Sequence, residues 1–304
     1  MPKLTFQYVR QGNRETLSEF LARRFMYHTR EEWETLILEG HVYVNGQPVP
    51  PTFLLQTRHK IVYHRPPGQE PEVDFTHTVL FEDDQILAVS KSGNIPSTPS
   101  GKYWHNCLVH LLQRHYAYAD LHAVHRLDRE TSGINLFAKN RDTARILGDD
   151  FHHGRVFKSY AAILHGHLPK REVDLEAPLR SAENSLIKIR QEVHPEGRPS
   201  RTVFRLRAIL PQACLVDAIP YTGRTHQIRA HAAHLGHPVW GDKLYADGEE
   251  RFLQWLSTGT RNAQDRQLLH ASALSFNHPV TGQRIELLDP PLSIMRLFEV
   301  WPGA

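Results

Sequence analysis

The chain contains little cysteine, with only Cys107 and Cys214 among its 304 residues. Two cysteines are too few for a disulfide framework or a cysteine-rich zinc site. No apolar run approaches the roughly 18 residues of a transmembrane helix, and the N-terminal segment lacks the apolar stretch and cleavage site of a signal peptide. The sequence therefore predicts a soluble, cytoplasmic protein with no membrane association.

Neither sign of charge dominates, because 36 Lys and Arg stand against 33 Asp and Glu, for a formal net charge of +3. The charge is unevenly distributed: residues 1–66 carry +3, 67–119 carry −3, 120–245 carry +5 and 246–304 carry −2. Such basic blocks suit a polyanionic partner, although ordinary solvated surfaces also carry charge. Hydrophobic residues make up 40% and charged residues 23%, which excludes disorder, collagen and coiled coil.

The first basic block has the pattern of two helices followed by a hairpin. Apolar side chains recur at helical spacing between residues 17 and 25, while the arginines lie off that stripe. Thr29 and Glu32 form the capping-box pattern that starts a second helix. Alternating residues then run into Asn45-Gly46, a strong hairpin signal, and a strand at 60–64 closes the unit.

Pro66 to Glu72 are rich in proline and glycine and predict a linker, which divides the chain into domains 1–66 and 67–304. In the larger domain strands and helices do not alternate strictly, so we expect an α+β fold with a mainly antiparallel mixed sheet flanked by helices. The elements expected are a helix over 141–151 and strands over 79–81, 86–89, 134–138, 157–164, 186–193 and 202–210.

One candidate site is the stretch His125 to Gly133, HRLDRETSG, which runs into an apolar strand. Here Asp128 stands between two arginines, Arg126 and Arg129. Its carboxylate suits a nucleophile, a general base or a metal ligand. On physical grounds alone, a structural ion pair with a neighbouring arginine is equally consistent with the pattern.

A second candidate stretch is Thr222 to Arg229, TGRTHQIR, which predicts a tight turn followed by a helix that ends at Gly236. Arg224 precedes that helix and Arg229 lies within it, and the planar guanidinium of either one suits a phosphate or a carboxylate. Histidines at 226, 231, 234 and 237 raise the question of a metal. No carboxylate or cysteine completes a familiar ligand pattern, so we expect no metal site.

Both stretches resemble motifs of the RluA-type pseudouridine synthases, HRLDRETSG for the first and TGRTHQIR followed by GDKLY for the second. Lys158-Ser159-Tyr160 resembles the lysine-x-tyrosine of the same family, and the matches extend from about residue 79 to 292. Residues 38–63, LEGHVYVNGQPVPPTFLLQTRHKIVY, resemble an S4-like RNA-binding module. One departure is the loop at 91–99, KSGNIPSTP, which lacks the first proline of the family's lysine-proline-x-glycine. We expect an altered loop there, with activity kept.

The resemblance implies an enzyme that isomerises a uridine within ribosomal or transfer RNA, as a monomer and without a cofactor. It breaks the N-glycosidic bond, turns the uracil and rejoins it through carbon. Asp128 is the implied catalytic carboxylate, as nucleophile or as base, with Arg224 as its expected partner and Tyr160 stacked on the base. Arg126 would fill the stack that the flipped uridine leaves. Further residues expected to bind RNA are Arg129, Lys158, Arg229, Arg14, Arg23 and Arg24.

Two other classes of protein keep part of this pattern. A non-catalytic RNA-binding or ribosome-assembly protein needs the basic surfaces, but has no need of Asp128, Tyr160 and Arg224 together. A metal-dependent hydrolase needs a bound ion, which elemental analysis of the purified protein would detect.

Overall fold

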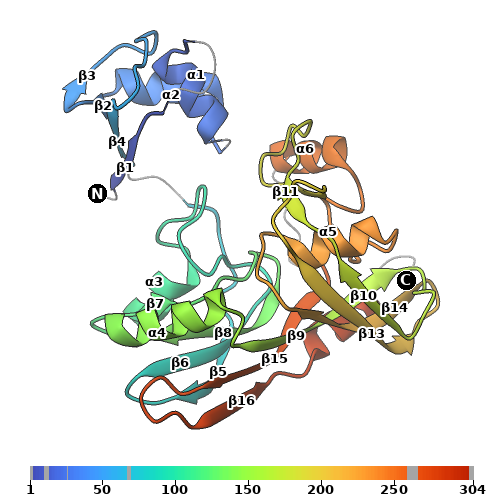
Figure 1. Cartoon of the computed structure of the whole chain (residues 1–304). Coiled ribbons are helices and arrows are strands. Elements are labelled where there is room, and N and C mark those ends of the chain that lie inside the picture. Colours follow the sequence, from blue (N-terminus) through green and yellow to red (C-terminus); the bar gives the residue numbers. More distant parts are fainter. Residues whose placement is uncertain (1–2, 10–13, 26, 67–69, 259–265, 301–304) are drawn as a thin grey trace. The chain divides into compact units, whose positions relative to one another are not determined.

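A computed structural model describes residues 3–9, 14–25, 27–66, 70–258 and 266–300 (Figure 1). The chain divides into two compact units. Unit 1 comprises Met1–Glu72 and Pro99–Asn106, and unit 2 comprises Val73–Thr98 and Cys107–Ala304. Among the described residues, no helix has the length and apolar character needed to cross a lipid bilayer.

Unit 1 is a four-stranded antiparallel sheet with two helices. The sheet order is β1-β4-β2-β3, in which every pairing is antiparallel. The expected helices, hairpin and closing strand are present, whereas the first strand, β1, carries no sequence signal that we identified. The elements are β1 (Lys3–Gln7), α1 (Leu17–Arg24), α2 (Arg30–Leu38), β2 (Val42–Val44), β3 (Gln47–Pro48) and β4 (Lys60–His64).

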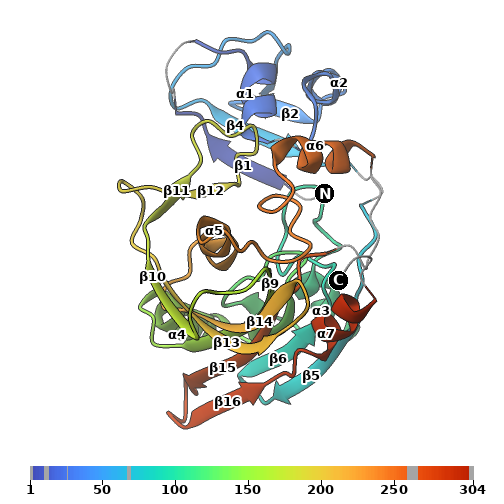
Figure 2. The ribbon, with the colours of Figure 1, turned by 90° about the vertical axis from the view of Figure 1, so that its right-hand side faces the viewer.

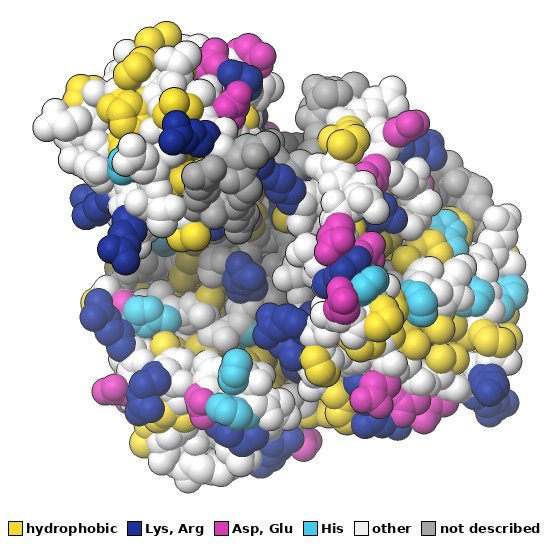
Figure 3. Space-filling model, turned by 45° about the horizontal axis from the view of Figure 1, so that its top comes forward, with side chains coloured by type: hydrophobic (Ala, Val, Ile, Leu, Met, Phe, Trp, Pro, Cys, Tyr) yellow, Lys and Arg dark blue, Asp and Glu magenta, His cyan; other side chains and the backbone are white. Residues whose placement is uncertain are grey.

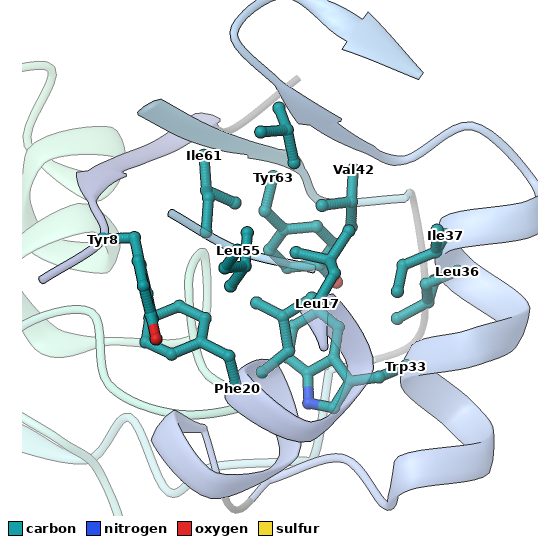
Figure 4. Close-up of a cluster of buried hydrophobic side chains, with 12 residues drawn as sticks. Tyr8, Leu17, Phe20, Trp33, Leu36, Ile37, Val42, Leu55, Ile61 and Tyr63 are labelled. Atoms are coloured by element: carbon teal, nitrogen blue, oxygen red, sulfur yellow. The ribbon is translucent and has the colours of Figure 1, made fainter. Parts of the chain in front are cut away.

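Local side-chain chemistry sets where these elements begin and end. Thr29 caps α2 through the reciprocal capping box with Glu32, as the sequence predicts, and Thr16 and Glu19 cap α1 in the same way. The hairpin turns at Asn45 and Gly46, which have φ of 51° and 81°. Figure 4 shows the core these elements enclose, in which Leu17, Trp33 and Tyr63 are almost fully buried.

A short segment from beyond the linker belongs to unit 1. The Glu70 carboxylate accepts the backbone N–H groups of Trp104, His105 and Asn106 at 2.8 to 2.9 Å. These bonds join Pro99–Asn106 to the end of the linker, so unit 1 is discontinuous in sequence. This division differs from the expected boundary after residue 66, and residues 67–69 of the predicted linker lie outside the described part.

Unit 2 is built on a ten-stranded sheet, in which the sequence-distant strands β8 and β15 form a parallel pair. The order is β10-β13-β14-β9-β15-β8-β6-β5, with β16 on β15 and β7 on β8, and the other pairings are antiparallel. The strands are β5 (His77–Glu82), β6 (Ile86–Lys91), β7 (His122–Ala123), β8 (Ser132–Ala138), β9 (Phe157–His165), β10 (Glu172–Glu176), β13 (Arg201–Ile209), β14 (Ala213–Pro220), β15 (Leu269–Asn277) and β16 (Arg284–Leu288). This is the mainly antiparallel α+β architecture that the sequence predicts.

Helices cover both faces of this sheet. One face packs against α4 (Arg141–His152) and α5 (Gln227–His234), and Tyr160 of β9 contacts both of the corresponding apolar clusters. The opposite face packs against α3 (Leu108–His115) and α7 (Leu292–Glu299). Figure 2 shows α5 on one side of the sheet and α3 and α7 on the other. A further helix is α6 (Glu249–Thr258).

The strand expected over residues 186–193 is mostly a turn. Only β12 (Gln191–Val193) is extended, and it pairs with β11 (Leu179–Ser181). The Ser185 hydroxyl accepts the backbone N–H of Ile187, and the N–H of Arg190 donates to the Ile187 carbonyl. These local hydrogen bonds bend the backbone, and they override the apolar alternation that suggested a longer strand.

Gly133 lies where β8 meets β15, and we expect alanine there to be strongly destabilising. Its φ is +102°, and a Cβ would stand 2.6 Å from the backbone nitrogen of Ala271 and closer still to the carbonyl oxygen. Gly282 is a matched control, since its φ is +71° and no atom lies within 4 Å of the added Cβ. In urea unfolding, Gly282→Ala should cost about 1–2 kcal/mol and Gly133→Ala at least about 3 kcal/mol. Equal losses would show that β15 does not constrain Gly133.

Candidate active site

A pocket in unit 2 gathers side chains from both sequence motifs. It lies where the loop before β8, the strand β9 and the N-terminus of α5 meet. Six predicted site residues, widely separated in sequence, line this one pocket: Arg126, Asp128, Lys158, Tyr160, Arg224 and Arg229.

The loop that carries Asp128 is held from the segment 91–98, where the sequence departs from the family pattern. The Ser97 hydroxyl accepts the backbone N–H of Leu127 at 3.0 Å and donates to the carbonyl of the same residue at 3.3 Å. The carbonyl of Arg129 accepts from the Ile95 backbone N–H and from Nζ of the buried Lys91. Despite its altered sequence, this segment therefore anchors both flanks of Asp128.

Arg229, and not Arg224, is the guanidinium paired with Asp128. Arg229 Nη1 donates to Asp128 Oδ2 at 2.8 Å, so the expected pairing with Arg224 is wrong. The physical reason is where each arginine lies relative to α5. Arg224 lies in the turn before α5, where its Nε donates to the Pro199 carbonyl at 3.2 Å, whereas Arg229 points from the helix into the pocket wall.

A second carboxylate, Asp242, fixes Arg229. It accepts from Arg229 Nε at 2.6 Å and from Nη2 at 2.9 Å, which is the bidentate geometry that only arginine offers. Asp242 also accepts the backbone N–H groups of Leu244 and Tyr245. Asp242 is 1% exposed and Arg229 7%. Arg229, expected to bind RNA, is thus engaged by two carboxylates. Asp242 belongs to the GDKLY motif but was not among the predicted site residues.

The surroundings of Asp128 keep its carboxylate ionised. Burial opposes ionisation, but the positive charges of protonated His226 and of Arg229, with hydrogen bonds from Arg229 and Gln267, lower the pKa of Asp128 to about 2. Because the pKa of His226 is itself lowered to about 4, Arg229 is the cation that acts at neutral pH. A third of the Asp128 side chain stays exposed, so an ionised carboxylate faces the pocket.

Two further pocket residues come from β9. Tyr160 lies against the apolar clusters beneath α4 and α5, and burial together with the charge of Asp128 raises the pKa of its phenol. Lys158 is 7% exposed, and burial lowers the pKa of its ammonium. Both residues line the pocket, as does Arg126 on the loop, whose side chain is exposed. The pocket thus combines an apolar aromatic wall with basic groups.

The remaining arginines expected to bind RNA lie elsewhere. Arg129 pairs with Glu130 at 2.9 Å, outside the pocket lining. In unit 1, Arg14 and Arg24 are exposed, whereas Arg23 donates to Glu15 through Nε at 2.9 Å and Nη2 at 2.6 Å. Figure 3 shows Lys and Arg exposed on both units, several with acidic side chains beside them.

Three of the four histidines that raised the metal question, His226, His231 and His237, have hydrogen-bond partners within the fold. His231 is fully buried, with Nδ1 2.9 Å from the Thr202 hydroxyl and Nε2 2.9 Å from the Ala177 carbonyl. His237 Nδ1 lies 2.9 Å from the His165 carbonyl. Within the described ranges, no three His, Cys, Asp or Glu side chains form a group that could hold a metal ion.

An ionised carboxylate paired with a buried arginine, beside the aromatic ring of Tyr160 and further basic side chains, is an arrangement that suits an enzyme acting on a nucleic acid base or sugar. Comparison with known proteins gives the family. Residues 85–234 match the RNA pseudouridylate synthase family, and residues 15–59 match the S4 domain.

Relatives of similar length carry the same assignment. The chain is 33% identical to an uncharacterized RNA pseudouridine synthase of Bacillus subtilis, over 83% of this chain and 87% of that protein. It is 36% identical to the ribosomal large subunit pseudouridine synthase C of Vibrio cholerae, over 71% of this chain and 66% of that protein. The structure of human RNA pseudouridylate synthase domain containing 1 superposes with a TM-score of 0.58 at 25% identity, over 73% of this chain and 86% of that one. The chain belongs to the RNA pseudouridine synthase family and carries an S4 domain.

Proposed function

We propose that Asp128 is the carboxylate that acts on the ribose of the target uridine. The observation that carries this proposal is the ion pair between Asp128 and the buried Arg229, which holds an ionised oxygen at the pocket. Attack on the anomeric carbon and removal of a ribose proton both need that ionised form. In the isomerisation the C1′–N1 bond breaks and a C1′–C5 bond forms, while the hydrogen leaves C5 and N1 gains a proton.

The target base reaches this carboxylate by flipping out of the RNA, at a cost of a few kcal/mol. The pocket is open to solvent and has a volume of about 120 Å³, close to the size of cavity that admits a single six-membered ring. Tyr160 stacks on the uracil there, and Arg126, whose side chain is exposed, occupies the gap in the RNA stack. Arg224 and Lys158 contact the substrate from the pocket wall, and Arg129 lies along the same RNA.

We propose large-subunit ribosomal RNA as the substrate. A Vibrio cholerae relative is named for that subunit at 36% identity, against 31% for a yeast mitochondrial tRNA pseudouridine(32) synthase. The division of labour follows the two expected domains: residues 1–66 bind RNA, and residues 67–304 carry out the chemistry without a cofactor. The enzyme acts in the cytoplasm as a monomer.

Mapping pseudouridines across all RNA from cells with and without this gene tests the proposal. We expect one or a few positions in large-subunit ribosomal RNA to lose the modification, and a plasmid copy of the gene to restore it. Loss confined to transfer RNA would overturn the proposed substrate. Unchanged maps in every RNA would overturn the proposed activity.

Exposed arginines of unit 1 should contribute to RNA affinity through phosphate contacts. We expect Arg14→Gln/Arg24→Gln to reduce the slope of log affinity against log salt by about 2, because each phosphate contact contributes about 1. Arg23→Gln is the matched control, since Glu15 already neutralises that guanidinium, and its slope should change by less than about 0.5. If the double variant keeps the wild-type slope, these arginines neutralise no phosphate.

A further inference from the structure

His226 has an unusual backbone conformation at the edge of the pocket. It is the residue that precedes α5, with φ of 51° and ψ of 20°, in the left-handed region that residues other than glycine rarely occupy. Its side chain is 8% exposed, and Nε2 lies 3.9 Å from Asp128 Oδ2. Strained conformations of this kind persist where the surrounding structure holds them, and they concentrate at functional sites.

A hydrogen-bond chain fixes which ring nitrogen of His226 carries the proton. The Tyr245 hydroxyl oxygen accepts the backbone N–H of Gln191 at 2.9 Å and lies 3.2 Å from His226 Nδ1. Within the described part of the chain, Nδ1 is the acceptor available to the hydroxyl proton. We therefore assign the acceptor role to Nδ1 and the hydrogen of the neutral ring to Nε2, the atom that faces Asp128.

Both partners keep these protonation states at neutral pH. Burial and the charge of Arg229 lower the pKa of His226 to about 4, and burial raises the pKa of Tyr245 to about 12. The titratable groups facing His226 are Asp128, Arg229, Asp242 and Tyr245. Between these two pKa values the His226 ring is uncharged, and its Nε2–H is a hydrogen-bond donor.

We propose that His226 is a further catalytic residue, a neutral donor whose Nε2–H binds a ribose oxygen of the target uridine. This inference rests on the proposed role of Asp128. At 3.9 Å the Asp128 oxygen is too far to accept a hydrogen bond from Nε2, and the described residues place no other acceptor within reach. A ribose whose anomeric region meets the Asp128 carboxylate lies within a few ångströms of Nε2, so one of its oxygens completes the bond.

Two substitutions at His226 separate the effect of losing the N–H donor from the effect of backbone strain. Leucine and glutamine both lack branching at Cβ and both carry the strain of a positive φ, but only glutamine retains an N–H donor. We expect His226→Leu to lower the single-turnover rate on saturating RNA about 10-fold or more and His226→Gln to regain most of that loss. RNA affinity should stay within about 3-fold of wild type in both variants. Tyr245→Phe keeps the ring 5.1 Å from the Arg229 guanidinium carbon but removes the hydroxyl, and it should slow the same step about 3-fold.

The assay is release of tritium from RNA carrying 5-tritiated uridine, because C5 loses its hydrogen when it bonds to ribose. Thermal unfolding reports whether each variant folds. Equal losses in His226→Leu and His226→Gln, or a wild-type rate in His226→Leu, would overturn the donor role. Failure of the proposed function itself looks different, since Asp128→Asn would then remain active or wild-type protein would release no tritium.

Discussion

Asp128→Asn is expected to abolish pseudouridine formation while RNA binding is retained. Asparagine has nearly the same shape, and its amide oxygen can still accept the hydrogen bond from Arg229 Nη1, so the pocket should keep its geometry. What disappears is the negative charge that both possible reactions at the ribose need. We expect the single-turnover rate to fall about 10³-fold or more, within the range that loss of an essential acid–base or nucleophilic group produces.

The control for this substitution is Asp217→Asn in β14. Its side chain has a similar exposure, 30% against 33% for Asp128, and it also pairs with an arginine, Arg207, but outside the pocket. We expect Asp217→Asn to retain the wild-type rate of tritium release. A rate within about 10-fold of wild type in Asp128→Asn would remove Asp128 from the chemistry, whatever the control shows.

Patterns confined to a few neighbouring residues predicted the local structure well. The capping box at Thr29 and Glu32, the Asn45-Gly46 turn and the strand Lys60–His64 are present as the sequence indicates. The capping box and the turn depend on hydrogen bonds or backbone angles within about four residues, and the strand was indicated by its own short run of residues. The strand predicted over 186–193 was wrong because local hydrogen bonds form a turn there. That turn, from Ser185 to Arg190, contains no glycine or proline that would have indicated it.

Contacts between segments far apart in the sequence could not be predicted from such local patterns. The parallel pairing of β15 with β8 joins residues more than a hundred positions apart. The residue that permits this close approach is Gly133, but glycine is also common in loops, so its presence does not indicate a strand pairing. The segment Pro99–Asn106 likewise joins unit 1 largely through Glu70, whose carboxylate accepts three of its backbone N–H groups. One acidic residue in a polar linker gives no signal that it binds backbone groups some thirty-five positions away.

The candidate site illustrates both outcomes. Motif resemblance selected Asp128, Tyr160 and the arginine-bearing turn, and the structure brings them into one pocket. The motif contains two arginines, however, and residue types alone do not decide which one meets Asp128. The choice follows from the helix: Arg229 lies on the pocket-facing side of α5, and Asp242 clamps its guanidinium from behind.

Arg229→Met should be the most destabilising substitution at the site. It would leave Asp242 almost fully buried with only backbone N–H partners, and removal of one member of a buried pair costs about 3–5 kcal/mol. Activity should fall as well, since without the guanidinium burial raises the pKa of Asp128 from about 2, and the acid limb of the rate profile moves to higher pH.

The sign of the pH dependence follows from the same shift. In the wild type the lowered pKa of Asp128 stabilises the fold above its ordinary value of 3.8, and that contribution is lost as pH falls towards 2. In Arg229→Met the pKa of Asp128 rises from about 2 towards its ordinary value of 3.8, so the stability that the ionised carboxylate contributes at neutral pH becomes smaller. The difference in unfolding free energy between the two proteins should be largest near pH 7 and should narrow as pH falls to about 3.

The double variant Arg229→Met/Asp242→Asn separates stability from catalysis. The amide oxygen introduced by Asp242→Asn can still accept the N–H groups of Leu244 and Tyr245, but the side chain carries no charge. We expect the double variant to recover about 2 kcal/mol of the lost stability in urea unfolding, because the uncompensated carboxylate is gone. Tritium release should stay as low as in Arg229→Met, because Asp128 still lacks its cation. If the double variant is no more stable than Arg229→Met, the loss of stability in Arg229→Met comes from lost packing and not from the unpaired charge of Asp242.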